Sequence, residues 1–292
     1  MTEQTAHTLI NPQNGNLAFK IFSFDDGNTF DHIQRLNYYS LIWIKEGSGR
    51  AKADFAEYNF SANSLFAFTP YQPFMFMGND IKGVVINFHP DFFCIHKHQG
   101  EVACNGVLFN NIYQPPFISI GPEAADTLHM LIENMRTEMQ NPALAQYELL
   151  VSYLKIFLIT ASRLKTQQQA QAMEAVKDLK EPFILQSLKE AIERDFKTKH
   201  SASDYASTLN ISAKALAKIT KTHLHKTLTE LIAERIVIEA KRELYLTHKT
   251  VKEIAYDLGY EDEYYFSRFF KSNAEVSPQL YRETVGFGRA MA

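Results

Sequence analysis

Residues 250–282 read TVKEIAYDLGYEDEYYFSRFFKSNAEVSPQLYR, and this stretch decides the fold of the C-terminal part of the chain. Thr250 and Glu253 form a capping box, in which a hydroxyl begins a helix and an acid stands three residues further on. The helix carries the small residue Ala255, and the apolar–turn–apolar triplet Leu258-Gly259-Tyr260 follows it. The stretch predicts a short helix, a tight turn and a second helix.

The same pattern occurs once more upstream. Ser201-Ala-Ser-Asp204 is another capping box, Ala206 is the small residue, and Leu209-Asn210-Ile211 is the triplet. The helix after each turn has apolar anchors, which are Leu216 and Ile219 in the first copy and Phe266 and Phe269 in the second. Alanine and first anchor are ten residues apart in the first copy and eleven in the second, so the second turn is one residue longer.

These features are the requirements of a helix-turn-helix. The first helix needs a small side chain where the second crosses it, and the turn needs a residue that tolerates a left-handed backbone. Ala206 with Asn210, and Ala255 with Gly259, meet both needs. One match is weak because many helix pairs fit the pattern, whereas two matches in one domain indicate DNA binding.

A long helix is expected between the two copies, from about Leu228 to Leu246, opened by a third capping box at Thr227 and Glu230. Its length of about 28 Å, at roughly 1.5 Å per residue, approaches the separation of about 34 Å between successive major-groove faces of B-DNA. A rigid spacer of this length can set two reading helices into adjacent major grooves.

Residues 235–282 resemble the signature region of the AraC/XylS family of transcription regulators. The matching pieces are Glu239–Leu244, Ile254-Ala255, Leu258-Gly259-Tyr260, Tyr265–Lys271, Ser277-Pro278 and Tyr281-Arg282. The resemblance covers about 183–283 and implies a DNA-binding domain over 183–292, with helix-turn-helix units at 202–222 and 251–272. Glu275 departs from the pattern, because the family usually has glycine there.

The resemblance also implies which side chains read bases. The family's reading positions fall on Lys214, Ala217 and Lys218 in the first unit and on Glu263, Tyr264, Ser267 and Arg268 in the second. Lys221 and Lys271 lie on the same predicted outward faces, whereas Ala215, Leu216 and Ile219 are expected to turn inward. Arg can bond two guanine acceptors and Glu can accept from cytosine. The alternative is that these are ordinary solvated helix faces, since most DNA contacts go to phosphate.

The first 120 residues are expected to form β-structure. Tyr38–Lys45 and Arg50–Phe55 read as two strands around a hairpin turn at Glu46-Gly47-Ser48-Gly49, and further short strands follow. Their number and spacing indicate a sandwich or barrel. Ile42–Gly49 and the turn from Pro70 to Gln72 resemble the cupin-like arm of many AraC-type regulators. The fold class expected is α+β: a cupin-like β-barrel with two appended helices, then an all-α domain.

The two appended helices are expected over about Glu123–Leu164. Leu128 and Leu131 lie on the apolar face of the first, and such a pair of helices either covers its own sheet or pairs with a second subunit. A stretch rich in Gln, Ala and Lys from Thr166 to Lys180 reads as a linker. The domains expected are a sensing and dimerisation domain at 1–165, a linker at 166–182 and the DNA-binding domain.

Composition neither supports nor excludes DNA binding. The chain has 292 residues and a net charge of −3. Residues 181–292 carry 17 basic against 16 acidic residues, so any DNA surface must concentrate its cations on one face. Two cysteines, a polar N-terminus and short apolar runs predict a cytoplasmic protein without a membrane partner.

A metal-dependent cupin enzyme with an accessory helical domain is the alternative function. Such an enzyme needs clustered histidines, but the strands at 38–50 and 64–77 have none, and Leu36 and Phe74 stand near the usual places. Cys94, His96, His98 and Cys104 form a metal-like cluster of nonstandard spacing. We expect no catalytic residue, metal or cofactor.

The sequence therefore predicts a transcription regulator that binds double-stranded promoter DNA as a homodimer. By resemblance, a small-molecule effector controls it, and RNA polymerase is a further candidate partner. Aromatic residues that could line the effector pocket, or simply form core, are Tyr39, Trp43, Phe66 and Phe68. A ligand-free architectural DNA-binding protein is a third interpretation.

Overall fold

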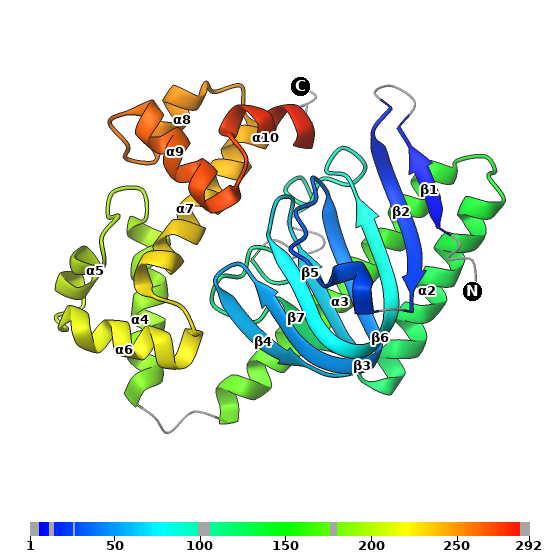
Figure 1. The fold of residues 1–292 in the computed structure, drawn as a ribbon, viewed down its shortest axis with the longest axis horizontal. Coiled ribbons are helices and arrows are strands. Elements are labelled where there is room, and N and C mark those ends of the chain that lie inside the picture. The colour runs from blue at the N-terminus through cyan, green and yellow to red at the C-terminus, as the bar shows by residue number, and fades with distance from the viewer. Residues whose placement is uncertain (1–5, 12–14, 26, 99–105, 176–179, 287–292) are drawn as a thin grey trace. The chain divides into compact units, whose positions relative to one another are not determined.

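The computed structural model describes residues 6–11, 15–25, 27–98, 106–175 and 180–286. The chain divides into two compact units. The first consists of Met1–Asn111 and Pro115–Gln169, and the second of Ile112–Gln114 and Ala170–Ala292. The first unit is rich in sheet and the second is helical, as the α+β prediction requires (Figure 1).

The first unit is built on one antiparallel sheet. Its strands follow the order β1-β2-β6-β3-β5-β7, and β4 pairs with β3 outside that path. The strands are β1 His7–Ile10, β2 Leu17–Phe24, β3 Tyr39–Ala53, β4 Ala56–Phe60, β5 Ser64–Phe68, β6 Phe74–Phe88 and β7 Phe117–Ser119, with a 3₁₀ turn at Gly27–Phe30. Within the described residues this path has two ends, β1 and β7. The likeness to a cupin stays a prediction.

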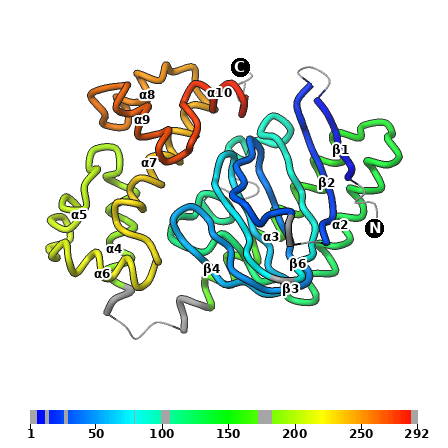
Figure 2. Tube along the Cα trace, in the orientation of Figure 1, coloured from blue at the N-terminus to red at the C-terminus, as the bar shows by residue number. Residues whose placement is uncertain are grey.

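The predicted hairpin turn at residues 46–49 is wrong. β3 runs through it without a break and pairs along its length with β6, beside which it lies in Figure 2. β6 is also one long strand, where the sequence predicts two short ones at Phe74–Met77 and Lys82–Phe88. The glycines have another role: a Cβ on Gly49 would stand 2.2 Å from the carbonyl oxygen of Met77, and one on Gly78 2.4 Å from that of Ser48. They allow two bulged strands to approach closely.

The two faces of the sheet bury different cores. One face packs against the helices α2, Pro122–Gln140, and α3, Gln146–Ala175. Leu128 and Leu131 belong to this core, with exposed fractions of 0% and 5%. The other face holds a second core rich in phenylalanine, which includes Phe66, Phe74 and Phe76. The predicted apolar face of α2 therefore covers the sheet of its own chain.

Helix α3 extends beyond its expected end at Leu164. It continues to Ala175, so residues 166–175 of the predicted linker are helical, while 176–179 lie outside the described residues. The physical reason is composition: Gln, Ala, Lys and Met are good helix formers, and neither Gly nor Pro interrupts them.

Two side chains of α3 hold the strand β7. The Gln168 amide donates to the Ser119 carbonyl oxygen at 2.6 Å and accepts from the Ser119 backbone nitrogen at 3.3 Å. The buried ammonium of Lys165 donates to the carbonyl oxygens of Pro115 and Phe117 at 2.5 and 2.8 Å. Burial lowers the pKa of Lys165 to about 8. The sheet edge is thus bonded to a helix.

The second unit is organised around the helix α7, Leu228–Leu246. Helices α4, α6, α8, α9 and α10 all contact it, and α5 packs on α4 and α6. The other helices are α4 Lys180–Asp195, α5 Ala202–Thr208, α6 Ala213–Leu224, α8 Val251–Asp257, α9 Glu263–Ala274 and α10 Pro278–Val285. The helix predicted from about Leu228 to Leu246 is confirmed, and its role as a spacer stays a prediction.

Within the described ranges, no helix combines the length and the apolar character that crossing a membrane requires.

Candidate nucleic-acid interface

Two helix-turn-helix units flank α7, one formed by α5 and α6 and the other by α8 and α9. The capping boxes that begin α5, α7 and α8 are all present, at Ser201, Thr227 and Thr250. In each, the hydroxyl accepts from the backbone nitrogen three residues on, and the acid there accepts from the cap nitrogen. The sequence signal for the start of these helices is confirmed.

The two turns have the same backbone design. Ala206 and Ala255 are buried, with exposed fractions of 5% and 0%. Each accepts from the backbone nitrogen five residues on, at 3.0 Å in the first unit and 2.9 Å in the second. Asn210 has φ 52° and Gly259 φ 79°, so both take the left-handed conformation that the spacing predicted.

Gly259 is needed for a second reason. A Cβ at this position would stand 2.1 Å from the carbonyl oxygen of Lys197, which precedes α5. Beside it, Tyr260 stacks on His200 with ring centroids 4.7 Å apart. The turn of the second helix-turn-helix unit therefore packs closely against the segment that leads into α5, and no side chain larger than hydrogen fits at Gly259.

The helices α6 and α9 are equivalent at both ends. Ser212 and Asp262 are N-caps whose side chains accept from a backbone nitrogen three residues on. His225 and Glu275 are C-caps, and both have φ 57°. Equivalent residues of the two helices are therefore fifty positions apart. The residue Glu275 adopts the left-handed geometry that glycine would supply, so the turn is retained without glycine.

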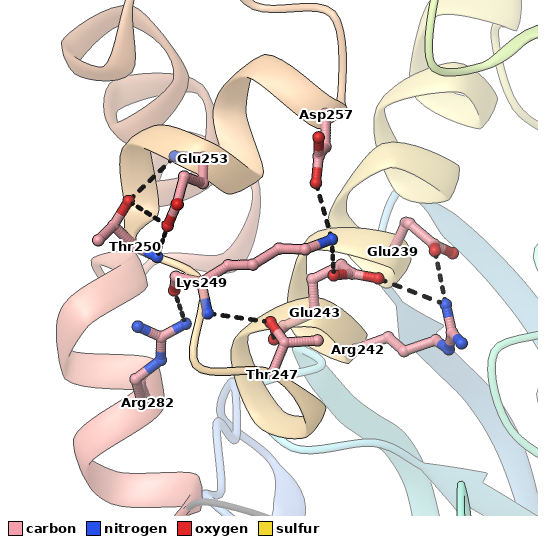
Figure 3. Close-up of polar contacts among 9 residues, drawn as sticks. All are labelled: Glu239, Arg242, Glu243, Thr247, Lys249, Thr250, Glu253, Asp257 and Arg282. Carbon is pink, nitrogen blue, oxygen red and sulfur yellow. Dashed lines mark hydrogen bonds and ion pairs between the residues drawn. The ribbon is translucent and has the colours of Figure 1, made fainter.

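Polar contacts hold the second helix-turn-helix unit, formed by α8 and α9, against α7 (Figure 3). Lys249 lies between Glu243 of α7, at 2.9 Å, and Asp257 of α8, at 2.7 Å. Its hydrogen bonds to these carboxylates raise the pKa of Lys249 above its usual value, and the bond to Asp257 has the largest effect. From α10, Arg282 donates to the carbonyl oxygens of Lys249 and Leu244 at 2.7 and 3.0 Å. These contacts define how α8 leaves α7.

A buried ion pair holds the first helix-turn-helix unit, formed by α5 and α6, against α7 in a comparable way. Just after α6, the Lys226 ammonium lies 2.7 Å from Glu234 of α7, with exposed fractions of 4% and 8%. A buried pair constrains orientation strongly, because moving either partner leaves a charge without compensation. Both helix-turn-helix units are thus attached to the one helix α7.

Most of the side chains predicted to read DNA lie at the surface. On α6 and α9 the exposed ones are Lys214, Ala217, Lys218, Lys221, Tyr264, Arg268 and Lys271. Glu263 and Ser267 are half-buried, as is the inward Ile219. Ala215 is exposed, so its predicted inward position is wrong: Leu216 and Thr220 form the buried side of α6, and Ala215 lies about 100° around the helix from Leu216. Leu216 is fully buried, as predicted.

Sequence reasoning missed Tyr265. Its side chain is 58% exposed next to Tyr264, which is 70% exposed, at the beginning of α9. Two adjacent tyrosines in the first turn of a helix whose anchors are Phe266 and Phe270 were the available signal, because the anchors direct that turn outward.

The four aromatic candidates for an effector pocket do not form one group. Tyr39 and Trp43 belong to the core under the helices, and Phe66 and Phe68 to the core on the other face of the sheet. All four are buried. Along each strand the two candidates are an even number of residues apart and share a face, but the register pairs Phe66 with Ile42 rather than Trp43. The two pairs therefore lie on opposite faces of the sheet and cannot line a single pocket.

The metal-like cluster shows ordinary contacts where it is described. Cys94 accepts from the Lys97 backbone nitrogen at 3.4 Å, and His98 stacks on Phe93 at 4.8 Å. Cys104 lies outside the described residues. In the part of the chain that the structure covers, no group of three or more His, Cys, Asp or Glu residues is placed to hold a metal ion.

Comparison with known proteins identifies the class of domain. A family model described as a helix-turn-helix domain matches residues 205–284, which contain both units except the start of α5. The helical unit carries an AraC-type helix-turn-helix domain, as the sequence resemblance predicted.

Among curated proteins, the raffinose operon transcriptional regulatory protein RafR of Pediococcus pentosaceus is 27% identical over 140 residues, or 48% of this chain and 46% of RafR. The regulatory protein SoxS of Salmonella typhimurium is 37% identical over 67 residues, 23% of this chain and 63% of SoxS. The chain thus spans about half the length of RafR. Of solved structures, ToxT from Vibrio cholerae is 16% identical with a TM-score of 0.39, covering 97% of each chain.

Proposed function

We propose that this chain is a sequence-specific DNA-binding regulator of transcription. The observation that carries the proposal is the pair of matched helix-turn-helix units on α7, each presenting an exposed polar face on its second helix. Duplex DNA is the partner that such faces fit, since one α-helix fills a major groove and polar side chains on it reach base edges. The names of the relatives RafR and SoxS agree with this role.

The sheet-rich unit is proposed to sense a small-molecule effector. Of the four aromatic candidates, Phe66 and Phe68 lie on the phenylalanine-rich face, away from α2 and α3. That face is the better place for an apolar effector, because the other face is filled by helices of the same chain. Residues 1–165 would then act as the sensing domain and residues from 183 as the DNA-binding domain.

A homodimer in the cytoplasm, acting on RNA polymerase at a promoter, completes the proposal. These partners follow from the regulatory role rather than from any contact within the chain. The metal-dependent enzyme is the weaker candidate, because the strands at 38–50 and 64–77 carry no histidine.

Genome-wide mapping of sites bound by the full chain, followed by binding assays on the recovered duplexes, tests the regulator. Residues 170–292, which include all of α4, are expected to bind the same duplexes more weakly than the full chain. The affinity of this fragment should fall steeply as salt rises, because Lys and Arg displace counterions from phosphates. A full chain that recovers no common sequence, or a folded fragment that ignores those duplexes at low salt, contradicts the proposal.

A further inference from the structure

The outward faces of α6 and α9 differ in chemistry although their backbones match. The fifty-residue equivalence of their caps pairs the outward positions one to one. The pairs are Ala213 with Glu263, Lys214 with Tyr264, Ala215 with Tyr265, Ala217 with Ser267, Lys218 with Arg268, and Lys221 with Lys271. Only the last pair is the same residue.

On α6 the outward face offers charge and little else. Lys214, Lys218 and Lys221 are exposed and spaced four and three residues apart, so they form one ridge along the helix. Between Ser212 and Lys221 there is no acidic residue. The exposed alanines between them, Ala213, Ala215 and Ala217, present methyl groups without a donor or an acceptor. An ammonium is a compact charge with rotating donors, which suits phosphate better than a particular base.

On α9 the outward face offers directed hydrogen bonds and little net charge. Glu263 is an acceptor, Ser267 is both donor and acceptor, and Arg268 is a planar guanidinium that can bond two guanine acceptors at once. Tyr264 adds a phenol ring that is 70% exposed. From Glu261 to Lys271 three carboxylates outnumber two cations, so this helix is not attracted to phosphate by charge alone.

We propose that the two units divide the work of binding. The α6 unit anchors the protein to the phosphate backbone with little dependence on sequence, and the α9 unit reads the bases of the adjacent major groove. The half-site under α9 is expected to contain a G·C pair bonded by Arg268 or Glu263 and a thymine methyl group against Tyr264. This inference rests on the proposed function and adds which half of the site carries the information.

The test uses the full chain and a pool of duplexes with a randomised centre. Selection from the pool by the unmodified chain first gives its preferred sequence. Affinity is then measured over a series of salt concentrations and over every single-base variant of that sequence, for the unmodified chain, Lys218→Ala, the triple change of Lys214, Lys218 and Lys221 to Ala, and Arg268→Lys. All substituted side chains are exposed, and circular dichroism verifies the fold.

The lysine variants are expected to change salt dependence without changing base preference. The slope of log K against log salt is negative, and each lost phosphate contact reduces its magnitude by about 0.9. The triple variant is therefore expected to lose roughly three times that magnitude. Arg268→Lys keeps the charge and the slope, but it loses about tenfold to a hundredfold of preference at one base pair, because the bidentate fork is gone.

Two results overturn the division: base preferences that shift under α6 in Lys218→Ala at constant slope, or preferences that stay intact in Arg268→Lys. If the unmodified chain selects no sequence from the pool, the proposed function itself fails, and this outcome is distinct from both.

Discussion

The C-cap of α9 is a position where the residue and its backbone conflict. Glu275 has φ 57°, which a residue with a Cβ adopts at a cost of about 1–2 kcal/mol. We expect Glu275→Gly to raise the free energy of unfolding by about 1 kcal/mol, because relief of strain exceeds the added freedom of the unfolded chain.

Urea denaturation measures this change. Ser272→Gly is the matched control: it lies within α9, where glycine is expected to lower the free energy of unfolding by about 0.5 kcal/mol. A loss of stability in both variants would show that the left-handed cap is not strained.

A second residue, Lys165, makes the stability of the sheet-rich unit depend on pH. Its folded pKa of about 8 lies below the usual value of 10.5, so between these two values the unfolded chain binds more protons. Stability should therefore rise as pH increases from about 8 to 10.5, by at most about 3 kcal/mol.

Lys165→Met removes the group and keeps the apolar part of the side chain. The measurement is the difference in free energy of unfolding between the two proteins at several pH values, which cancels the titration of other groups. If that difference is constant from pH 7 to 10.5, the ammonium is not desolvated in the folded protein.

Among the elements, the crossing of α8 and α9 leaves no room for a larger side chain. Ala255 lies on α8, which packs against α9, and its exposed fraction is 0%. Ala255→Leu is expected to cost about 1–3 kcal/mol through overpacking and to weaken DNA binding. The control Ala217→Leu, on the exposed face of α6, should alter stability by less than about 0.5 kcal/mol.

Elements fixed by local signals were predictable from the sequence. The capping boxes at Ser201, Thr227 and Thr250 each depend on a hydroxyl and an acid three residues apart, and the left-handed turn depends on Asn or Gly. The exposed ridge on α6 followed in the same way, because its period is that of a helix. Nothing beyond neighbouring residues was needed for these features.

Features fixed by distant residues were not predictable. The glycines at 47 and 49 carry the signal of a turn, but they exist to let β6 approach, and Met77 is not adjacent in sequence. Likewise, Trp43 and Phe66 lie on opposite faces because β3 and β5 pair in the register that sets Phe66 against Ile42, and this register is not visible in either strand alone. Sequence patterns give periodicity, whereas partners come from the fold.

For the whole molecule, the proposed dimer must use side chains that the first unit leaves exposed. Met130 of α2 and Ile156 of α3 have exposed fractions of 57% and 48%. If these helices form the subunit contact, Ile156→Glu should convert a dimeric full chain into a folded monomer, because a buried carboxylate without a partner is costly. Sedimentation of the full chain at micromolar concentration, with and without DNA, measures this.

Leu128→Asn is the control for that experiment. Leu128 is buried against the sheet of its own chain, so the change should lower stability without a specific effect on assembly. An unmodified chain that sediments as a monomer both free and on DNA rules out the dimer.

The bonds between Gln168 and Ser119 have a consequence for solubility. A strand at the end of a sheet presents unpaired amides that can recruit a strand from another molecule, which leads to aggregation. The Gln168 side chain occupies both the donor and the acceptor of Ser119, as a neighbouring strand would. By imitating that strand with a single amide, α3 closes this part of the edge β7 to uncontrolled growth of the sheet.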